Sequence, residues 1–391
     1  MILADLNIVD WVLIGILFLL FVAEVYFYAR YLAAPSRCLR PGKKEAKPLS
    51  EYPGVSILVC ARNESVNLSA YLEALLTQDY PTYEVIVVDD GSEDNTHDVI
   101  EAYMLRDDRL HTTFVPRGAR VRSTKKLALT LAAKAAQYDY LLLTDADCVP
   151  ASNQWIRRMI EGFADAKTDI VLGYGAYFDE PGFVNRLVRY DTLFNGLHYL
   201  GAALGGHPYM GVGRNLAYRK SLFFETGGFS HLMDNPAGDD DLFVNHLATK
   251  ENTAVVLVPS AYTWSPSKTV FRDWFQQKRR HLSVSPSYRE STKMRLTLEP
   301  LCRGLFYCFT ILLIYLGCRA GVMTPKGWML LGSALLFFVT RWVLLVSIIN
   351  ASAQRMRQVG FTPFAILGMD IFLPLVSLWM LCIPQPKGKK W

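Results

Sequence analysis

The stretch Tyr83-Glu-Val-Ile-Val-Val-Asp89-Asp90-Gly91-Ser92 joins an apolar run directly to two acids and a turn. A second stretch of the same design follows at Tyr140-Leu-Leu-Leu-Thr144-Asp145-Ala146-Asp147. Short apolar runs bounded by turn residues are typical of strands that are buried in a parallel sheet. Ligands gather at the carboxyl ends of such strands. The two acidic ends therefore predict a binding site at one edge of the sheet.

The chain around these stretches alternates between strand and helix signals from residue 52 to residue 265. Val55–Ala61 is a further apolar strand, and a helix is expected from Asn63 to about Gln78. Three more elements are expected, a helix, a strand and a helix, near 95–105, 111–115 and 125–137. Alternation of this kind predicts an α/β fold with a mostly parallel sheet covered by helices.

Asp145 and Asp147 place two carboxylates on one tight turn. Oxygen ligands of this kind suit Mg²⁺ or Mn²⁺, which in turn bridge the oxygens of a diphosphate. Taken alone, an acidic turn is common, and Asp89-Asp90-Gly91 is an ordinary loop because Asp and Gly favour turns. The position of both acidic pairs at strand ends is what favours a metal and diphosphate site.

A third acidic cluster, Gly238-Asp239-Asp240-Asp241, begins an expected helix. Acidic residues at a helix start interact favourably with the helix dipole, and a single acid would do that. Three adjacent acids repel one another, which suggests that one of them is kept for chemistry. A carboxylate placed here is able to accept the proton of an acceptor hydroxyl as a general base.

A basic amphipathic helix is expected around Asp273–His281, with Trp274 and Phe275 on its apolar face. Gln277 and Arg280 are three residues apart and therefore lie together on the helix surface. A basic helix with aromatic residues next to a membrane segment is typical of the membrane interface, and a plain lipid-surface anchor is the alternative interpretation. Arginine also binds phosphate oxygens in a forked geometry that lysine does not match.

Four apolar blocks flank this region, at 9–32, 300–321, 326–350 and 362–383. Each is close to the roughly 20 helical residues that cross a bilayer core of about 30 Å. The first block lacks the basic start and the cleavage site of a signal peptide. Arg341 and Asp370 lie inside the later blocks, and for these two a structural pair is favoured over a role in transport.

The basic stretch Arg37–Lys47 after the first block indicates that the domain is cytoplasmic and that residues 1–8 face outward. Four complete crossings would then place Lys387, Lys389 and Lys390 outside, against the positive-inside tendency. Two explanations stay open: one carboxy-terminal block is re-entrant or interfacial, or the charges of the tail are too few to decide.

The composition agrees with apolar blocks in an otherwise charged chain of 391 residues, 51% hydrophobic and 20% charged. The net charge of +5 is modest and does not favour nucleic acid as a partner, since anionic lipid or a diphosphate explains it equally well. The seven cysteines are scattered and show no CxxC spacing, so neither a disulfide framework nor a zinc site is expected.

In this order, the motifs VSILVCARNE, VVDDGS, TDAD, GDDDLF and QKRRH resemble those of the family 2 glycosyltransferases, over roughly residues 50–285. The likeness is greatest to membrane polysaccharide synthases such as the cellulose, hyaluronan and poly-N-acetylglucosamine synthases. The resemblance implies a GT-A-like fold in which Asp89 and Asp90 hold the nucleotide. Asp145 and Asp147 would hold the metal and the diphosphate, so that Asp145 also contributes to nucleotide-sugar binding.

The resemblance also implies a base in the third cluster and donor contacts elsewhere. Aligned without gaps, GDDDLF favours Asp240 as the base, and a register one residue earlier selects Asp239. Gln277 and Arg280 match the family's QxxRW motif, with His281 in place of the tryptophan that meets the terminal sugar in processive synthases.

Two further stretches fit the same resemblance. In Ser123-Thr124-Lys125-Lys126 a lysine, for which Lys126 is chosen, would meet the diphosphate; an exposed basic turn is the alternative. The glycine-rich stretch His207–Asn215 occupies the position of a loop near the acceptor.

The implied activity is metal-dependent, inverting transfer of a sugar from a nucleotide-sugar donor to a lipid-linked or glycan acceptor at the inner (plasma) membrane. A processive polysaccharide synthase is the alternative within the family, and a non-enzymatic membrane scaffold is the alternative of another class. The expected organisation is an amino-terminal membrane helix, a basic linker, a cytoplasmic GT-A domain, an interfacial segment and the carboxy-terminal membrane segments, at 1–33, 34–51, 52–268, 269–298 and 299–391.

Overall fold

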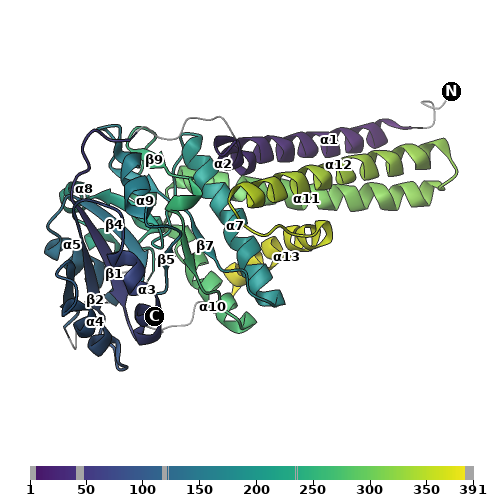
Figure 1. The fold of residues 1–391 in the computed structure, drawn as a ribbon. Helices are drawn as coiled ribbons and strands as arrows, with labels where there is room; N and C mark the ends of the chain where they lie inside the picture. Colours follow the sequence, from purple (N-terminus) through teal and green to yellow (C-terminus); the bar gives the residue numbers. More distant parts are fainter. Residues whose placement is uncertain are drawn as a thin grey trace.

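The computed structural model shows an α/β domain at one end and a bundle of long helices at the other (Figure 1). It describes residues 6–40, 48–116, 121, 123–233, 235 and 237–383. Lys43, Lys44 and Lys47 of the expected basic linker, and the lysines of the carboxy-terminal tail, lie outside the described residues.

A seven-stranded sheet forms the centre of the domain, in the order β3-β2-β1-β4-β8-β6-β9. β1 pairs in parallel with β2 on one side and with β4 on the other, and β8 is the antiparallel strand. The predicted mostly parallel sheet is therefore confirmed. The bounds are β1 Val55–Ala61, β2 Tyr83–Asp89, β3 Leu110–Phe114, β4 Tyr140–Asp145, β6 Ile170–Leu172, β8 Leu216–Arg219 and β9 Thr253–Val255.

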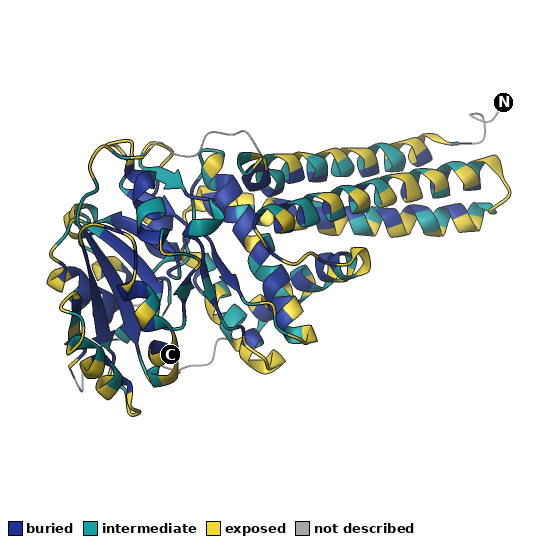
Figure 2. Cartoon of the chain, in the orientation of Figure 1, coloured by how far each residue is buried: buried dark blue, intermediate teal, exposed yellow. Residues whose placement is uncertain are grey.

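Helices cover both faces of the sheet, and the burial is continuous across it (Figure 2). Successive side chains of a strand point to opposite faces. Thus Ile57 and Val59 pack with α3, α4 and α6, whereas Leu58 packs with α5, α7 and α9. These helices are α3 Ser65–Leu76, α4 Thr96–Met104, α5 Thr124–Ala135, α6 Trp155–Ile160, α7 Phe183–Leu204, α8 Lys220–Glu225 and α9 Asp241–Leu247.

A second, three-stranded sheet lies beside the first, in the order β5-β10-β7 (Val149–Pro150, Thr263–Ser265 and Gly175–Tyr177). The helix α10, Phe271–Leu282, follows β10. It confirms the amphipathic helix expected around residues 273–281, and Trp274 is its buried residue. Lys278 of α10 forms an ion pair with Asp191 of α7 at 2.6 Å, which ties the two helices together.

Four helices are long and apolar enough to cross a membrane: Ile8–Cys38, Glu290–Ala320, Pro325–Arg355 and Pro363–Cys382. This confirms one amino-terminal and three carboxy-terminal segments. The first consists of α1 Ile8–Phe27, the π-helix η2 Tyr28–Leu32 and α2 Ala33–Cys38. The other three are α11 Glu290–Ala320, α12 Pro325–Arg355 and α13 Pro363–Cys382. α1, α11 and α12 lie side by side, whereas α13 turns back toward the domain (Figure 1).

Contacts at both ends of α13 define its path. Near its start, Trp342 in the middle of α12 donates to the carbonyl of Pro363 at 3.1 Å. Near its end, the ring of Trp379 lies 5.2 Å from that of Phe275 on α10. α13 therefore begins beside the middle of α12 and ends at the domain.

Ion pairs join the membrane helices at two levels. Near the domain, Arg341 of α12 contacts Glu24 of α1 at 2.9 Å and Asp370 of α13 at 2.8 Å. Arg303 of α11 extends this buried network to Asp370 and to Glu299. At the far end, Lys326 contacts Asp10 at 2.7 Å. Arg341 and Asp370 thus form the structural pair favoured from the sequence.

Candidate active site

The acidic strand ends lie at one edge of the sheet because β2 and β4 flank β1 in parallel. Residue pairing places Asp89 beside Ala61 and Asp145 beside Cys60 at the end of β1. A pocket opens here, lined by Cys60, Lys125, Leu129, Leu143, Thr144, Asp145, Gly213 and Asp239. The edge predicted from the sequence is therefore where the structure forms a pocket.

The Asp89–Asp90 turn holds its two carboxylates differently. Asp89 accepts a hydrogen bond from the backbone N–H of Ser92 at 2.9 Å, across Gly91, whose φ of +68° favours glycine. Asp90 is buried, and its Oδ2 lies 3.8 Å from Arg62. Burial raises the pKa of Asp90, although a hydrogen bond to Thr124 opposes this. Asp90 is thus fixed by the protein, and Asp89 remains at the rim.

Lys125 connects two of the acidic clusters. Its Nζ lies 3.0 Å from Asp145 Oδ1 and 3.1 Å from Asp239 Oδ2. Burial by itself would lower the pKa of Lys125, but the carboxylates of Asp145 and Asp239 raise it well above its usual value. A permanently charged ammonium group therefore lies between the second and the third acidic cluster.

Lys126, the lysine chosen from the sequence, is not brought to these carboxylates. Its Nζ is buried and donates to the backbone carbonyls of Leu232, Asn235 and Ala237 at 2.7, 2.8 and 2.7 Å. Lys126 therefore holds the loop before the third acidic cluster. The two lysines point apart because adjacent residues on a helix do not share a face.

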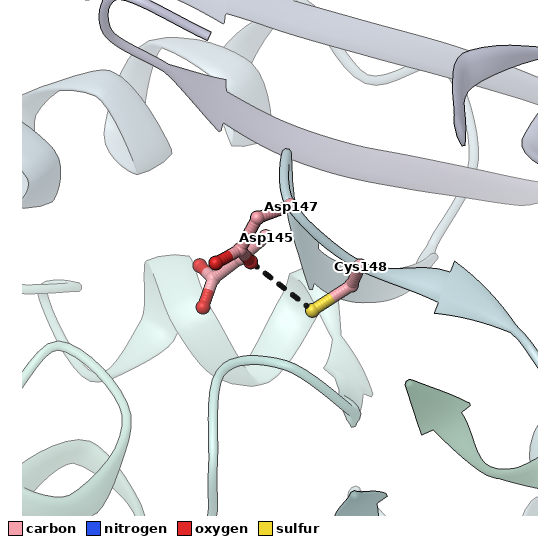
Figure 3. Close-up of side chains that lie close together, drawn as sticks. All are labelled: Asp145, Asp147 and Cys148. Atoms are coloured by element: carbon pink, nitrogen blue, oxygen red, sulfur yellow. Dashed lines mark hydrogen bonds between the residues drawn. The ribbon is translucent and has the colours of Figure 1, made fainter. Parts of the chain in front are cut away.

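Asp145 and Asp147 lie next to each other, with the sulfur of Cys148 facing Asp147 (Figure 3). Their ligand atoms all lie within 4.8 Å of one another. Cys148 donates to Asp147 at 3.4 Å, and burial raises the pKa of its thiol well above the usual value, so this sulfur stays protonated. The two carboxylates fit a hard divalent cation, and the protonated thiol does not.

The three acids of the third cluster have separate surroundings. Asp239 faces Lys125, and although burial would raise its pKa, this lysine lowers it. Both oxygens of Asp240 accept backbone hydrogen bonds at 2.7 Å, one from the N–H of Gly213 and one from the N–H of Asp241. The second bond makes Asp240 the N-terminal cap of α9. Asp241 is buried and accepts a hydrogen bond from Tyr288 at 3.0 Å. Of the three, Asp239 is the one that lines the pocket.

Gln277 and Arg280 reach the site to different extents. Gln277 donates to the hydroxyl of Tyr177 at 3.4 Å, and Arg280 is exposed on the surface of α10. The guanidinium of Arg214 lies 4.2 Å from the centre of the Tyr177 ring. Burial alone would lower the pKa of Arg214, but neighbours that include Tyr177 and Asp147 raise it. Contacts thus lead from α10 through Tyr177 to Arg214, whose charge acts on Asp147.

Sequence reasoning missed Lys125 and Arg214 as site residues. Lys125 belongs to the stretch that it singled out, and the choice between adjacent lysines depends on the rotation of α5. Arg214 lies in the glycine-rich loop expected near the acceptor, directly after Gly213. A lone arginine in such a loop carries no signal that distinguishes it from a solvated side chain.

Residues 56–227 match the protein family described as Glycosyl transferase family 2. This range includes β1 to α8 and the first two acidic clusters, but neither Asp239–Asp241 nor α10.

Curated relatives carry names of the same kind. Glycosyltransferase AglE of Haloferax volcanii is 28% identical over 148 residues, which are 37% of this chain and 47% of the relative. A poly-beta-1,6-N-acetyl-D-glucosamine synthase of Staphylococcus epidermidis is 34% identical over 96 residues, 25% of this chain and 22% of the relative. The matched regions span less than two thirds of these relatives.

A solved structure extends the likeness in fold to nearly the whole chain. The mannosyltransferase PcManGT of Pyrobaculum calidifontis, in complex with GDP-Man and Mn²⁺, aligns with a TM-score of 0.51 at 19% identity. The alignment covers 94% of this chain and 95% of that one. It confirms the predicted GT-A-like architecture.

Proposed function

Because this chain carries a family 2 glycosyltransferase domain, we propose that it transfers a sugar from a nucleoside-diphosphate sugar to an acceptor hydroxyl at the membrane. The observation that carries this proposal is that Asp145, Lys125 and Asp239 line the same pocket and contact one another through the Lys125 ammonium group. Carboxylates for a cation, an ammonium group for a diphosphate and a further carboxylate for a proton are the groups that such a transfer needs.

The donor would bind along the carboxyl ends of β1, β2 and β4. Asp89 and Asp90, at the end of β2, would contact the nucleoside, and Asp145 and Asp147 would hold Mg²⁺ or Mn²⁺ against the diphosphate. When bound, such an ion neutralises charge on the departing diphosphate. The presence of GDP-Man and Mn²⁺ in the structurally similar mannosyltransferase is in keeping with this assignment.

Asp239 is the proposed general base, in place of Asp240. Both oxygens of Asp240 are engaged by backbone N–H groups, whereas Asp239 faces the pocket. The acceptor hydroxyl gives its proton to Asp239 and its oxygen attacks the anomeric carbon. The bond from that carbon to the diphosphate breaks as the new bond forms, and the diphosphate leaves from the face opposite the attacking oxygen. The configuration of the anomeric carbon is thereby inverted.

Lys125 is the proposed partner of the diphosphate. Its ammonium group lies beside Asp145, where the cation and the phosphate oxygens would meet. Charge that develops on the leaving group would be stabilised there by a group already held in place. The same ammonium group contacts Asp145 and Asp239 in the structure.

Transfer of a single sugar to a membrane-bound acceptor is favoured over processive synthesis. The described core of the three-helix bundle is filled by Leu17, Phe306, Leu313, Leu330 and Ala334, and its domain end by the ion pairs of Arg341. Packing of this kind provides no polar path for a growing glycan. His281, which stands where processive synthases have tryptophan, agrees with this preference.

The test is a screen of nucleotide-sugars with the full-length protein in lipid nanodiscs. Release of nucleoside diphosphate that needs Mg²⁺ or Mn²⁺, together with a product extended by one sugar, is the expected result. A ladder of long products would replace single transfer by processive synthesis. If the protein binds the donor but shows no turnover with any of the acceptors extracted from membranes, the result would favour the non-enzymatic membrane scaffold.

A further inference from the structure

A second pocket lies where η2, α7 and α11 meet, and it shares no lining residue with the acidic pocket. Much of its wall is apolar or aromatic and includes Phe27, Tyr31, Ala202 and Leu296. The rings of Tyr31 and His198 stack with their planes 14° apart. The pocket lies on the domain side of the ion-pair network, because Glu299 belongs to both.

The backbone around this pocket is fixed by a close contact between two helices. Tyr31 lies in the π-helix η2, and a Cβ atom on Gly201 of α7 would lie 2.1 Å from the carbonyl oxygen of Tyr31. Only glycine therefore allows α7 to lie this close to η2. π-Helical turns within longer helices are frequent at functional sites.

Basic side chains from different elements surround the turn at Gly205–His207. Arg30 donates to the carbonyl of Gly205 at 2.6 Å, and a Cβ atom on Gly206 would lie 3.0 Å from the side chain of Lys250. His207 and the exposed Arg295 line the pocket itself. Burial, and then the positive charges of Arg295 and Arg30, lower the pKa of His207.

Negative charge does not balance this group from within the pocket. Glu299 is the lining acid, and it is already paired with Arg303 in the buried network. Burial also lowers the pKa of His198, the α7 histidine that lines the pocket. The described groups around the pocket therefore leave a net positive charge next to an apolar wall.

We propose that this pocket binds an anionic membrane phospholipid. The phosphate would lie between Arg295 and His207, and an acyl chain would follow Leu296 and Phe27 toward the bundle. Tyr26, which precedes Phe27 on α1 and is 58% exposed, continues this path toward the bundle. Basic residues at the cytoplasmic boundary attract anionic headgroups, and aromatic rings favour the same depth.

The experiment is native mass spectrometry of the full-length protein, delipidated in neutral detergent and titrated with dioctanoyl-phosphatidylglycerol. Arg295→Gln should weaken binding about tenfold, because an exposed charge-assisted contact is lost without loss of packing. Lys293→Gln, on the same helix but outside the pocket and paired with Glu290, is the matched control and should bind as the unmodified chain does.

Two further ligands and one variant complete the test. Dioctanoyl-phosphatidylcholine and inorganic phosphate should each bind at least about tenfold more weakly than the phosphatidylglycerol, because the site needs both the net charge and the chain. Ala202→Leu, which fills the apolar wall, should reduce phosphatidylglycerol binding. Equal binding by Arg295→Gln, by phosphatidylcholine or by free phosphate would overturn the proposal.

Discussion

Two adjacent lysines at the start of α5 have different environments. Lys125 lies between Asp145 and Asp239 in the pocket, whereas Lys126 is buried among the carbonyls of residues 232, 235 and 237. A buried ammonium group without such partners would be costly, so these carbonyls explain why a charged side chain is tolerated there. One lysine thus belongs to the pocket and the other to the loop that positions the third acidic cluster.

Replacing each lysine by methionine should separate these roles. Lys125→Met is expected to weaken binding of a nucleoside diphosphate by about 10- to 100-fold, because the ammonium group proposed to contact the diphosphate is lost. Lys126→Met leaves three carbonyls without their donor, and should lower the free energy of unfolding by roughly 2–3 kcal/mol. Calorimetric titration and thermal unfolding measure the two effects. The reverse pattern would exchange the two assignments.

The acids of the third cluster provide a second pair of variants. Asp239→Asn should reduce turnover by at least about 100-fold while nucleotide binding persists, because the acceptor proton has no base. Asp240→Asn keeps one of the two oxygen acceptors at the start of α9. It should therefore lower the stability of the fold more than it lowers turnover. Rates of diphosphate release and nucleotide affinity measured on the same preparations decide between them. A fully active Asp239→Asn variant would contradict the assignment of Asp239.

The carboxylates proposed to bind the metal can be tested separately. Asp147→Ala removes one of the two hard ligands, so the gain in nucleotide affinity on adding Mn²⁺ should disappear. Cys148→Ala is the matched control, because its thiol stays protonated and should contribute nothing to the cation. An unchanged Mn²⁺ dependence in Asp147→Ala would argue against a metal at this turn.

Among the elements, the membrane helices depend on a charged side chain that is buried. Arg341 holds Glu24 of α1 and Asp370 of α13, and so connects three helices. Its forked guanidinium suits two carboxylates at once, which a lysine ammonium group does not match. The apolar packing of Leu17 and Leu330 lies beyond this layer.

Arg341→Leu should be strongly destabilising, by about 3–5 kcal/mol, because it leaves the buried carboxylate of Glu24 without its charged partner and leaves Asp370 with Arg303 alone. Arg341→Lys should give an intermediate loss. Thermal unfolding in detergent, followed by tryptophan fluorescence, measures both variants. Arg319→Leu, an exposed position at the far end of α11, is the control and should change little. Equal stability of Arg341→Leu and the unmodified chain would contradict a structural role for the pair.

The sequence predicted the elements around the first two acidic clusters closely because local signals determine them. β1 has the expected bounds Val55–Ala61. β2 and β4 each extend one residue beyond the expected strands, Tyr83–Val88 and Tyr140–Thr144, to Asp89 and Asp145. α7 was not expected, although it runs from Phe183 to Leu204, because its contacts with η2 and α10 are tertiary. That Asp239 and Lys125 both line the pocket likewise depends on the rotation of their elements, which no local pattern specifies.

In the whole molecule, the path of α13 bears on how the chain crosses the membrane. α13 starts beside Trp342 in the middle of α12 and ends against Phe275 of α10, so it runs from the middle of the bundle back to the domain and does not reach the far end of the bundle. We therefore favour three crossings with α13 at the interface, one of the two explanations that the charge of the tail left open.

Two native cysteines test this topology. Cys318 near the end of α11 and Cys382 at the end of α13 are both exposed, and neither is in a disulfide. In variants that keep one of them, a membrane-impermeant maleimide should label Cys318 in intact cells and Cys382 only after the cytoplasmic side is opened. Labelling of both in intact cells would show that α13 crosses the bilayer.

The spacing between the two ion-pair levels has a consequence for the bilayer itself. Asp10 and Glu24 are separated by about 21 Å along α1 at 1.5 Å per helical residue, and the exposed rings of Trp11 and Tyr26 mark nearly the same levels. A typical hydrocarbon core is about 30 Å thick, so hydrophobic mismatch should thin the lipid around this bundle. Sugar transfer measured in vesicles of increasing acyl-chain length should therefore be fastest in the shorter-chain lipids and fall as the bilayer thickens.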